Sequence, residues 1–411
     1  MKLMKTTALA TIAVFAGGAA YADCGIESGN INILGNDFAP IQMIVEGAMA
    51  CASDSVTVEA NLTTEHRDLQ VAALTANPAQ YTSAIVANSS IVPLMNEDLI
   101  RPLDDLVEKY GQGLNRNQLI TIDGKVMAIA FMANAQHLYV REDILAQAGL
   151  GIPSTYEEVI AAAQKLEADG IMQNPFVTNT ATGWNLGEEF VNMYLGHGGA
   201  FFEPGTANVS INNEAGIATL ETMKALTELS NPDFLTFDSN ASAAIWEAGE
   251  AALGFMWGSR AAPILDDEGS TEEVTSNTRL VGAPTVAGGD KPASTLWWDG
   301  FTISKNISDE DAEATFRALM NGLTEDRIKA NNDMTVWLAP GYTPTDTAAG
   351  VFATANSGAS PYPMIPFMGL LHSALGNELS DFLQGSESAE QALADVEAAY
   401  TAAAKEQGFL Q

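Results

Sequence analysis

The chain has 411 residues, of which 47% are hydrophobic and 17% charged, a globular composition with enough apolar side chains for one or two cores. Lys and Arg number 18 against 52 Asp and Glu, which gives a formal net charge of −34. A surface this acidic repels polyanions and excludes nucleic acids as partners. The length indicates two domains, with three as the alternative.

The first 22 residues have the three parts of a secretory signal peptide. Lys2 and Lys5 form a basic start, residues 9–16 (LATIAVFA) form a short apolar stretch, and Ala20-Tyr21-Ala22 is a small-x-small cleavage site. The apolar stretch is far shorter than the ~20 residues that a membrane-spanning helix needs. We therefore expect export, cleavage near Ala22 and a soluble chain in the periplasm.

Two cysteines, Cys24 and Cys51, lie near the start of the mature chain. In an oxidising compartment an isolated pair is most simply a disulfide. Acylation of Cys24, as in a lipoprotein, is an alternative, but Asp23 stands where that modification needs a small residue. A metal or redox site is less favoured, because there is no Cys-x-x-Cys and neither cysteine has a His close by in sequence. We expect no metal and no cofactor.

Short apolar strands alternate with helical patterns after the cysteines. Strands are predicted at 31–34, 56–62 and 84–87, and each ends in polar residues. A helical pattern follows the first strand, with apolar residues at Ile41, Ile44, Val45 and Ala48. This alternation predicts an α/β fold with a mostly parallel sheet that carries helices on both faces.

Several later helices begin at recognisable capping residues. Ser154-Thr155 precede Glu157-Glu158 in two overlapping capping boxes, and that helix is predicted to end at Gly170. Ser308 with Asp311 and Ser388 with Gln391 open two further helices. The chain has no internal repeat and no long Pro- or Gly-rich linker. Two lobes would therefore be joined by several short crossings.

Motifs of enzyme chemistry are missing. The chain has no G-x-S-x-G elbow, phosphate-binding loop, G-x-G-x-x-G or H-E-x-x-H. The histidines are scattered without metal-ligand spacing and are interpreted as surface or hydrogen-bonding residues; they are His66, His137, His197 and His372. Among 52 acidic residues, no pair of glycosidase carboxylates can be singled out. We predict no catalytic residue.

The six tryptophans are more informative; they are Trp184, Trp246, Trp257, Trp297, Trp298 and Trp337. Several stand beside glycine and polar residues, as in Gly183-Trp184-Asn185 and in residues 256–260 (MWGSR) and 297–300 (WWDG). An indole next to hydrogen-bonding side chains suits a pocket that stacks the C–H face of a sugar and binds its hydroxyls. The alternative for each is an anchor in the core, to which we assign Trp246.

A set of motifs in the correct order resembles family 1 extracellular solute-binding proteins, the maltose-binding-protein-like receptors of ABC importers. Residues 124–130 (GKVMAIA), 137–145 (HLYVREDIL), 148–150 (AGL) and 152–158 (IPSTYEE) resemble the block "G-x-x-Y-G-x-P … Y-Y-N-K-D-x-F … G-x-x-x-P-x-T-W-x-E". Further matches are 190–199, 247–260 (EAGEAALGFMWGSR), 282–284 before 288–289, 300–306 (GFTISKN) and 386–400. The similarity covers nearly the whole mature chain.

Two departures from the family pattern concern the pocket. The usual Y-Y-N-K-D reads Tyr139-Val140-Arg141-Glu142-Asp143, and the usual D-V after an early strand is replaced by Ala87-Asn88-Ser89. No specific ligand is therefore carried over from the family.

The resemblance implies two discontinuous α/β lobes around a cleft, joined by hinge strands. We expect an N-terminal lobe of 23–131 plus 285–335 and a C-terminal lobe of 132–284 plus 336–411. In such folds ligands lie outside the carboxyl ends of parallel strands. The strand ends and the family positions together predict the ligand-binding residues Asn36, Asp37, Glu65, Asn88, Ser89, Asn134, Trp184, Trp257, Arg260, Trp297, Trp298 and Asp299. The alternative for the polar ones is a helix cap or turn.

The function that the resemblance implies is capture of a carbohydrate or polyol by cleft closure, and its delivery by a monomeric receptor to membrane permease subunits. A secreted glycoside-active enzyme is one alternative. Another is the same fold with a different solute, including a peptide. Asp37, Glu65 and Asp299 converging without stacked Trp would favour a polyamine, whereas Arg260 at the centre would favour a phosphate or carboxylate.

Overall fold

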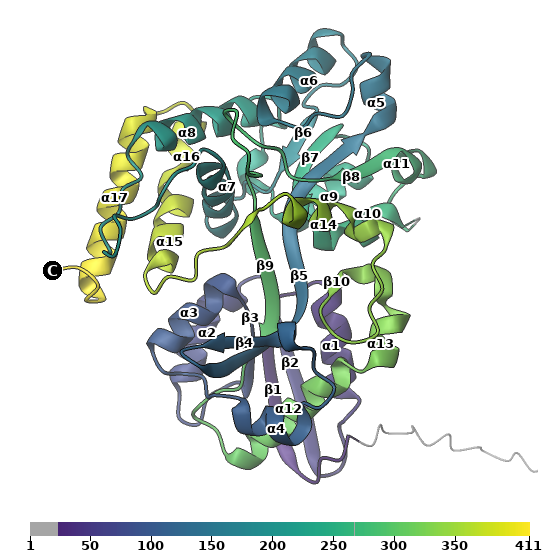
Figure 1. The fold of residues 1–411 in the computed structure, drawn as a ribbon, viewed down its shortest axis with the longest axis vertical. Coiled ribbons are helices and arrows are strands. Elements are labelled where there is room, and N and C mark those ends of the chain that lie inside the picture. The colour runs from purple at the N-terminus through teal and green to yellow at the C-terminus, as the bar shows by residue number, and fades with distance from the viewer. Residues whose placement is uncertain (1–23, 267) are drawn as a thin grey trace, which may run out of the picture.

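The computed structural model describes residues 24–266 and 268–411. The expected signal peptide and its cleavage site lie outside these residues. The described chain forms two halves, one above the other in Figure 1, with β5 (Lys125–Arg141) and β9 (Thr295–Phe301) running between them. Within the described residues, no helix combines the length and the apolar character needed to cross a membrane.

The lower half in Figure 1 contains the first three βα units of the chain. Its strands and helices are β1 (Gly29–Gly35), α1 (Ala39–Met49), β2 (Val56–Leu62), α2 (His66–Thr75), β3 (Ser83–Ala87), α3 (Asn88–Asn96), α4 (Asp104–Tyr110), β4 (Leu119–Ile122), α12 (Asp309–Gly322), α13 (Glu325–Ala330) and the short β10 (Val336–Trp337). The predicted strands and the predicted first helix are all present.

The upper half contains the remaining elements. They are α5 (Glu142–Gln147), α6 (Tyr156–Ala168), β6 (Phe176–Thr178), α7 (Trp184–Gly196), α8 (Glu214–Thr227), α9 (Ser239–Glu247), β7 (Leu253–Trp257), α10 (Ala261–Leu265), α11 (Glu272–Asn277), β8 (Thr278–Val281), α14 (Ala349–Asn356), β11 (Ser360–Pro361), α15 (Met368–Glu378), α16 (Ser380–Leu383) and α17 (Ala389–Glu406). Single 3₁₀ turns occur at 116–118, 234–236, 258–260, 332–334 and 346–348.

The sheet is mixed, which corrects the expectation of a mostly parallel one. Its strand order is β2-β1-β3-β9-β5-β7-β6. The β1 strand pairs in parallel with β2 and β3, but β9 is antiparallel to β3, and β5 is antiparallel to β4, β7, β8, β9 and β10. Antiparallel neighbours need no helical crossover. The parallel βα pattern at the start of the chain therefore does not extend to β5 and β9, the strands that connect the halves.

Each half has its own hydrophobic core. Ile33 and Phe316 belong to the main core of the lower half, whereas Phe190 and Leu393 belong to that of the upper half. Two segments pack on the other side of the boundaries expected from the sequence. Val286 and Ala293 are buried in the upper core, and Trp337 and Ala339 are buried in the lower one. Chain segments therefore cross between the halves near β9 and after β10.

The predicted helix caps are present, except that only one of the two capping boxes expected before α6 forms, because Glu157 accepts from the Ala287 N–H instead of pairing with Ser154. The Thr155 hydroxyl accepts a hydrogen bond from the Glu158 N–H, and the Glu158 carboxylate accepts one from the Ser154 N–H, as in a capping box. Ser308 and Ser388 cap α12 and α17 in the same way, through the N–H groups three residues on. Gly170 has a φ of 66°, the left-handed conformation typical of a helix C-terminus.

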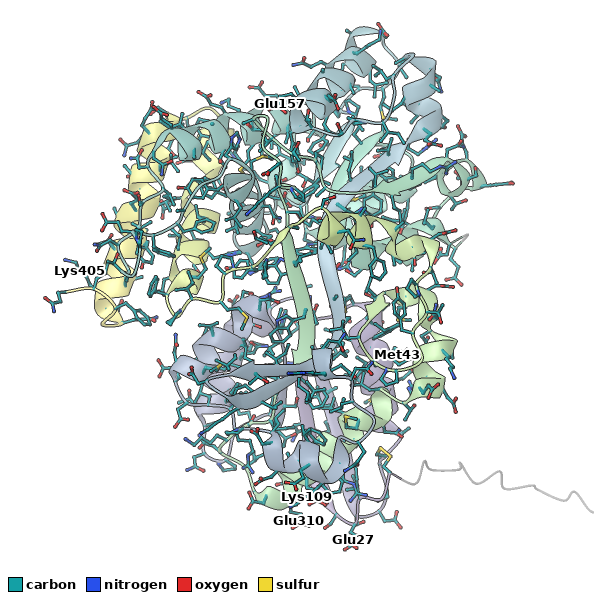
Figure 2. All side chains as sticks on the ribbon, viewed as in Figure 1. Glu27, Met43, Lys109, Glu157, Glu310 and Lys405 are labelled. Atoms are coloured by element: carbon teal, nitrogen blue, oxygen red, sulfur yellow. A yellow bond between two sulfur atoms is a disulfide. The ribbon has the colours of Figure 1, made fainter. Side chains whose placement is uncertain are left out.

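Cys24 and Cys51 form the expected disulfide, which ties the start of the described chain to the residues after α1. Its sulfur–sulfur bond lies at the lower end of the molecule, where charged side chains such as Glu27, Lys109 and Glu310 point outward (Figure 2). Trp246 is fully buried in the upper half, where its indole N–H donates to the Thr278 hydroxyl, so its assignment to the core is confirmed.

Candidate ligand-binding site

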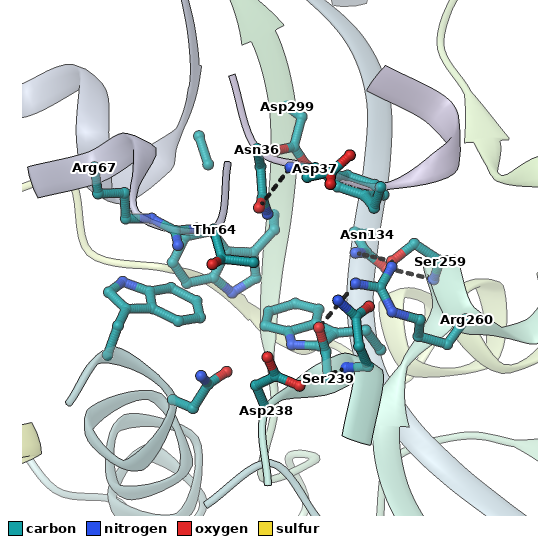
Figure 3. Close-up of a pocket in the computed structure, with 17 residues that line it drawn as sticks. Asn36, Asp37, Thr64, Arg67, Asn134, Asp238, Ser239, Ser259, Arg260 and Asp299 are labelled. Carbon is teal, nitrogen blue, oxygen red and sulfur yellow. Dashed lines mark hydrogen bonds between the residues drawn. The ribbon is translucent and has the colours of Figure 1, made fainter. Parts of the chain in front are cut away.

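A small cavity of about 140 Å³ lies between the two halves, beside β5 and β9 (Figure 3). Its walls combine aromatic rings with charged and amide side chains from both halves. The lining residues are Asn36, Asp37, Phe38, Thr64, Arg67, Ala87, Asn134, Trp184, Asn185, Asp238, Ser239, Asn240, Trp257, Ser259, Arg260, Trp297 and Asp299. Among the described residues, no group of three or more His, Cys, Asp or Glu side chains could hold a metal ion.

The lower half contributes the residues that follow its parallel strands. Asn36 and Asp37 come after β1, Thr64 and Arg67 come after β2, and Ala87 ends β3. The three strands are parallel neighbours in the order β2-β1-β3, so their carboxyl ends meet at one edge of the sheet. This is the edge where open α/β sheets bind ligands.

The upper half contributes three loop regions. Gly183 has a φ of 97° and lets the chain turn sharply into α7, where Trp184 is the first residue. A Cβ atom on Gly376 of α15 would lie 2.1 Å from the Gly183 carbonyl oxygen, so the two glycines permit close packing that fixes this turn. Trp257 ends β7, and the start of α9 contributes Ser239.

Three indole rings form a cluster at the cavity. The Trp184 and Trp257 rings stack with centroids 6.3 Å apart, and the Trp297 ring stands edge-on to both, at 5.4 and 5.8 Å. The Trp297 N–H donates to Glu188 Oε1 over 3.0 Å, below the cavity wall. This hydrogen bond orients the Trp297 ring and occupies its N–H group. The ring therefore contributes apolar surface to the cavity.

Two arginines contact aromatic rings of the opposite half. The Arg67 guanidinium carbon lies 4.0 Å from the Trp184 ring centroid, and that of Arg260 lies 5.2 Å from the Phe38 ring centroid. Both distances are within the range of cation–π attraction. Each half thus supplies one arginine and one aromatic ring to the contacts that link the halves across the cavity.

Some polar residues at the cavity are occupied by structural hydrogen bonds. The Asn134 amide donates to the Ser259 hydroxyl and accepts from the Ser259 N–H, which fixes the turn after β7 against β5. Asp238 Oδ1 accepts from two N–H groups at the start of α9, and Asp37 Oδ1 accepts from the Gln42 amide. These carboxylates keep their second oxygen for other partners.

Burial shifts the pKa of several carboxyls at and below the cavity. It raises the pKa of Asp299 to about 6, and the neighbouring Arg67 and Arg260 charges limit the rise. Burial raises the pKa of Glu188 well above its usual range, although a hydrogen bond from Thr295 opposes the shift. Burial likewise raises the pKa of Glu189 to about 8, against the hydrogen bond from the Gln136 amide. In both residues burial therefore favours the neutral, protonated carboxyl.

Eight of the twelve residues predicted from the sequence line the cavity: Asn36, Asp37, Asn134, Trp184, Trp257, Arg260, Trp297 and Asp299. Their role in binding stays a prediction. The other four, Glu65, Asn88, Ser89 and Trp298, are not among the lining residues.

Each of these four lies elsewhere for a local reason. Side chains alternate along a strand, so Trp297 and Asp299 face the cavity while Trp298 packs against a core of the lower half. The Asn88 amide holds β9 instead, because it donates to the Leu296 carbonyl and accepts from the Trp298 N–H. Glu65 is exposed before α2, and the half-buried Ser89 lies in the first turn of α3.

Sequence reasoning missed nine lining residues: Phe38, Thr64, Arg67, Ala87, Asn185, Asp238, Ser239, Asn240 and Ser259. Most are immediate neighbours of residues that were predicted. The sequence pattern therefore identified the loop but not every residue of it that lines the cavity. Asp238 and Ser239 gave a different signal, because an Asp before an apolar helical run is a typical N-cap. Nothing local distinguished Arg67, which lies two residues beyond Glu65 in α2.

Comparison with known proteins gives matches in both sequence and structure. The family model described as bacterial extracellular solute-binding protein matches residues 56–328. A protein of Deinococcus radiodurans described as a probable ABC transporter-binding protein is 24% identical over 270 residues. That match covers 63% of this chain, and it spans 59% of the length of the curated relative.

Solved structures match the fold over nearly the whole chain. The maltose-bound MalE3 of T. maritima is 19% identical with a TM-score of 0.77, and covers 91% of this chain and 99% of its own. An ABC transporter solute-binding protein of Agrobacterium radiobacter in complex with ribitol is 20% identical with a TM-score of 0.78, covering 90% and 97%. One of Agrobacterium vitis with bound D-mannitol is 18% identical with a TM-score of 0.76, covering 93% and 99%.

Proposed function

The chain belongs to the family of bacterial extracellular solute-binding proteins, and on this premise we propose that it is the receptor of an ABC importer for a small polyhydroxylated solute. One observation carries the proposal. The cavity between the halves is lined by three indole rings and by polar side chains of both halves. Indole faces stack on the C–H surfaces of sugars and polyols, and the polar groups bind hydroxyls.

The size of the cavity supports a small ligand. Its volume of about 140 Å³ is below the roughly 300–1,000 Å³ of pockets for drug-sized ligands. A single sugar ring or an open-chain polyol suits this space better than an oligosaccharide. Among the structural relatives, the two Agrobacterium proteins are described with the polyols ribitol and D-mannitol. The proposed ligand class is therefore a monosaccharide or polyol.

Closure of the two halves is the proposed mechanism of capture. We assign 23–131 plus 285–335 and 132–284 plus 336–411 to the two moving lobes, with the boundaries shifted where Val286 and Trp337 pack into the opposite core. A ligand that contacts both lobes favours the closed state by its differential affinity for that state. The contacts of Arg67 with Trp184 and of Arg260 with Phe38 add to the stability of that state.

We propose binding without turnover. A glycosidase needs two carboxyl groups free to act on opposite sides of one bond. Here one oxygen of Asp37 and one of Asp238 accept hydrogen bonds from their own chain segments, which leaves each carboxylate a single oxygen for a ligand. In this proposal the protein is exported, is cleaved near Ala22, acts as a monomer in the periplasm and delivers its solute to permease subunits in the membrane. The acidic net charge of −34 opposes self-association.

The test is a panel of hexoses, pentoses, polyols, disaccharides, polyamines and dipeptides, titrated into the purified chain. Binding should change the fluorescence of the tryptophans at the cavity and raise the melting temperature. Isothermal titration calorimetry should give one site per chain, and the solute should be recovered unchanged. Binding of polyamines or peptides alone, or release of a cleaved product, would contradict the proposal.

A further inference from the structure

Two guanidinium groups in the cavity have no ion-pair partner within the part of the chain that the structure describes. Arg67 and Arg260 enter from opposite sides and extend toward the middle of the pocket (Figure 3). Among the described residues, neither lies within 4.0 Å of a carboxylate oxygen. The Nε atom of each is buried without a hydrogen-bond partner, and Arg260 is only 8% exposed.

The hydrogen bonds that these arginines do make leave most of their donors unused. Arg260 donates to the Ser239 hydroxyl over 2.8 Å and to the Ser259 hydroxyl over 3.5 Å. Arg67 contacts the Trp184 ring through its face. A guanidinium carries five N–H donors, and burying it without acceptors is costly. Its best partner is a planar carboxylate or a phosphate, bound by charge-assisted hydrogen bonds.

The cavity is lined by carboxylates as well as by the two guanidiniums. Asp299 is the carboxyl whose charge acts on both arginines. Glu188 lies below the cavity, where burial raises its pKa well above its usual range. Asp37 is exposed at the rim and bonded to Gln42. Asp238 also lines the cavity, and its charge acts on Arg260. Among the described residues none of these carboxylates lies within 4.0 Å of either guanidinium, so the guanidinium donors stay open to an anionic group of the ligand.

Resting on the proposed function, we propose that the solute is a sugar acid of monosaccharide size, a hexuronate or aldonate whose single carboxylate is bound by Arg67 and Arg260. The indole rings of the cavity wall offer apolar surface to its C–H groups, and Asn36 and Asp299 line the same cavity as partners for its hydroxyls. A single carboxylate can accept charge-assisted hydrogen bonds from both guanidiniums. A sugar phosphate carries close to two charges and a bulkier group, so the lining carboxylates Asp37, Asp238 and Asp299 would repel it more strongly and the small volume would fit it less well.

The first test uses the wild-type chain alone, at pH 7.5 and about 0.15 M salt. Calorimetry compares matched pairs that differ only in the acid: D-galacturonate with D-galactose, D-glucuronate with D-glucose, and D-gluconate with sorbitol. Glucose 6-phosphate is added as the phosphate counterpart. We expect the acid of at least one pair to bind at least tenfold more tightly than its neutral partner and than the phosphate.

The outcomes separate this inference from the proposed function. Equal or tighter binding of every neutral partner would overturn the sugar acid and leave the receptor for polyhydroxylated solutes in place. Tighter binding of the phosphate would do the same. If no sugar, polyol or sugar acid binds at millimolar concentration, the proposed function itself fails.

Arginine variants then test which side chains bind the carboxylate of the ligand. In Arg67→Gln and Arg260→Gln, the ratio of acid affinity to neutral affinity should fall toward one, with most of the change in the acid. Arg279→Gln is the matched control, because Arg279 forms a surface ion pair with Glu142 away from the cavity. A ratio that stays at the wild-type value in both cavity variants contradicts the assignment, and the ratio does not depend on how much of each variant is folded.

Discussion

The Arg67 guanidinium carbon lies 4.0 Å from the centroid of the Trp184 ring, although the two residues belong to opposite halves of the molecule. Arg67 comes from α2, and Trp184 is the first residue of α7. This contact places a cation of the lower half against a ring of the upper half at the wall of the cavity.

Trp184→Leu should favour the open state and weaken ligand binding by about tenfold. The change removes a ring that the Arg67 cation contacts, an attraction worth about 1–2 kcal/mol when partly desolvated. Small-angle scattering of the unliganded protein should then give a larger radius of gyration than for wild type. Trp184→Phe is the control, because it keeps an aromatic face. An unchanged radius and affinity in Trp184→Leu would show that this contact does not hold the halves together.

Trp257 and Trp298 distinguish a cavity residue from a neighbouring core residue. Trp257→Ala should weaken the ligand by tenfold or more, about 1.4 kcal/mol, since the ring forms part of the cavity wall. Trp298→Ala should leave the affinity within about twofold, because this side chain packs in a core. Calorimetry with the best ligand of the panel measures both. The reverse ranking would mean that the ligand lies on the other face of β9.

Asn88→Ala should lower stability by about 1–3 kcal/mol, because it leaves the Trp298 N–H and the Leu296 carbonyl without their side-chain partner. Urea unfolding followed by circular dichroism measures the loss. Ligand affinity should change little when the variant is folded. A large loss of affinity with normal stability would instead return Asn88 to the binding residues, where the sequence pattern placed it.

The Cys24–Cys51 disulfide closes a sequence separation of 27 residues. Replacing both cysteines with alanine should lower the free energy of unfolding by about 3 kcal/mol, chiefly because the unfolded chain regains conformational freedom. The wild-type protein should show the same loss when a reducing agent is present. The double variant should not respond to the reducing agent, and a response there would assign the effect to another cause.

Glu189→Gln should flatten the dependence of stability on pH. Burial raises the pKa of Glu189 to about 8 in the folded chain, so the folded state holds this proton more tightly than the unfolded state does. The proton's contribution to stability is complete below the unfolded pKa and is lost as pH rises through about 8. The melting temperature of wild type should fall relative to that of Glu189→Gln between about pH 5 and 8. Parallel curves would contradict a buried neutral carboxyl.

The local elements and the family pattern follow from the sequence alone. The strand at β1, the capping box before α6 and the pairing of Cys24 with Cys51 depend on neighbouring residues or on a single possible partner. The ordered motifs also predict the two-lobed α/β fold, because a family resemblance summarises many such local choices. Eight of the twelve candidate residues line the cavity because strand ends and glycine-flanked tryptophans mark the correct loops.

Only the tertiary structure decides which side chain of a loop or strand faces the ligand. Trp297 and Trp298 are adjacent in sequence, but the alternation of a strand sends them to opposite faces, and the register with β3 and β5 determines which face is the cavity. Arg67 lines the cavity because the two halves meet there, with the Arg67 guanidinium on α2 against the Trp184 ring of α7. Such contacts join residues more than a hundred positions apart, so no local pattern in the chain encodes them.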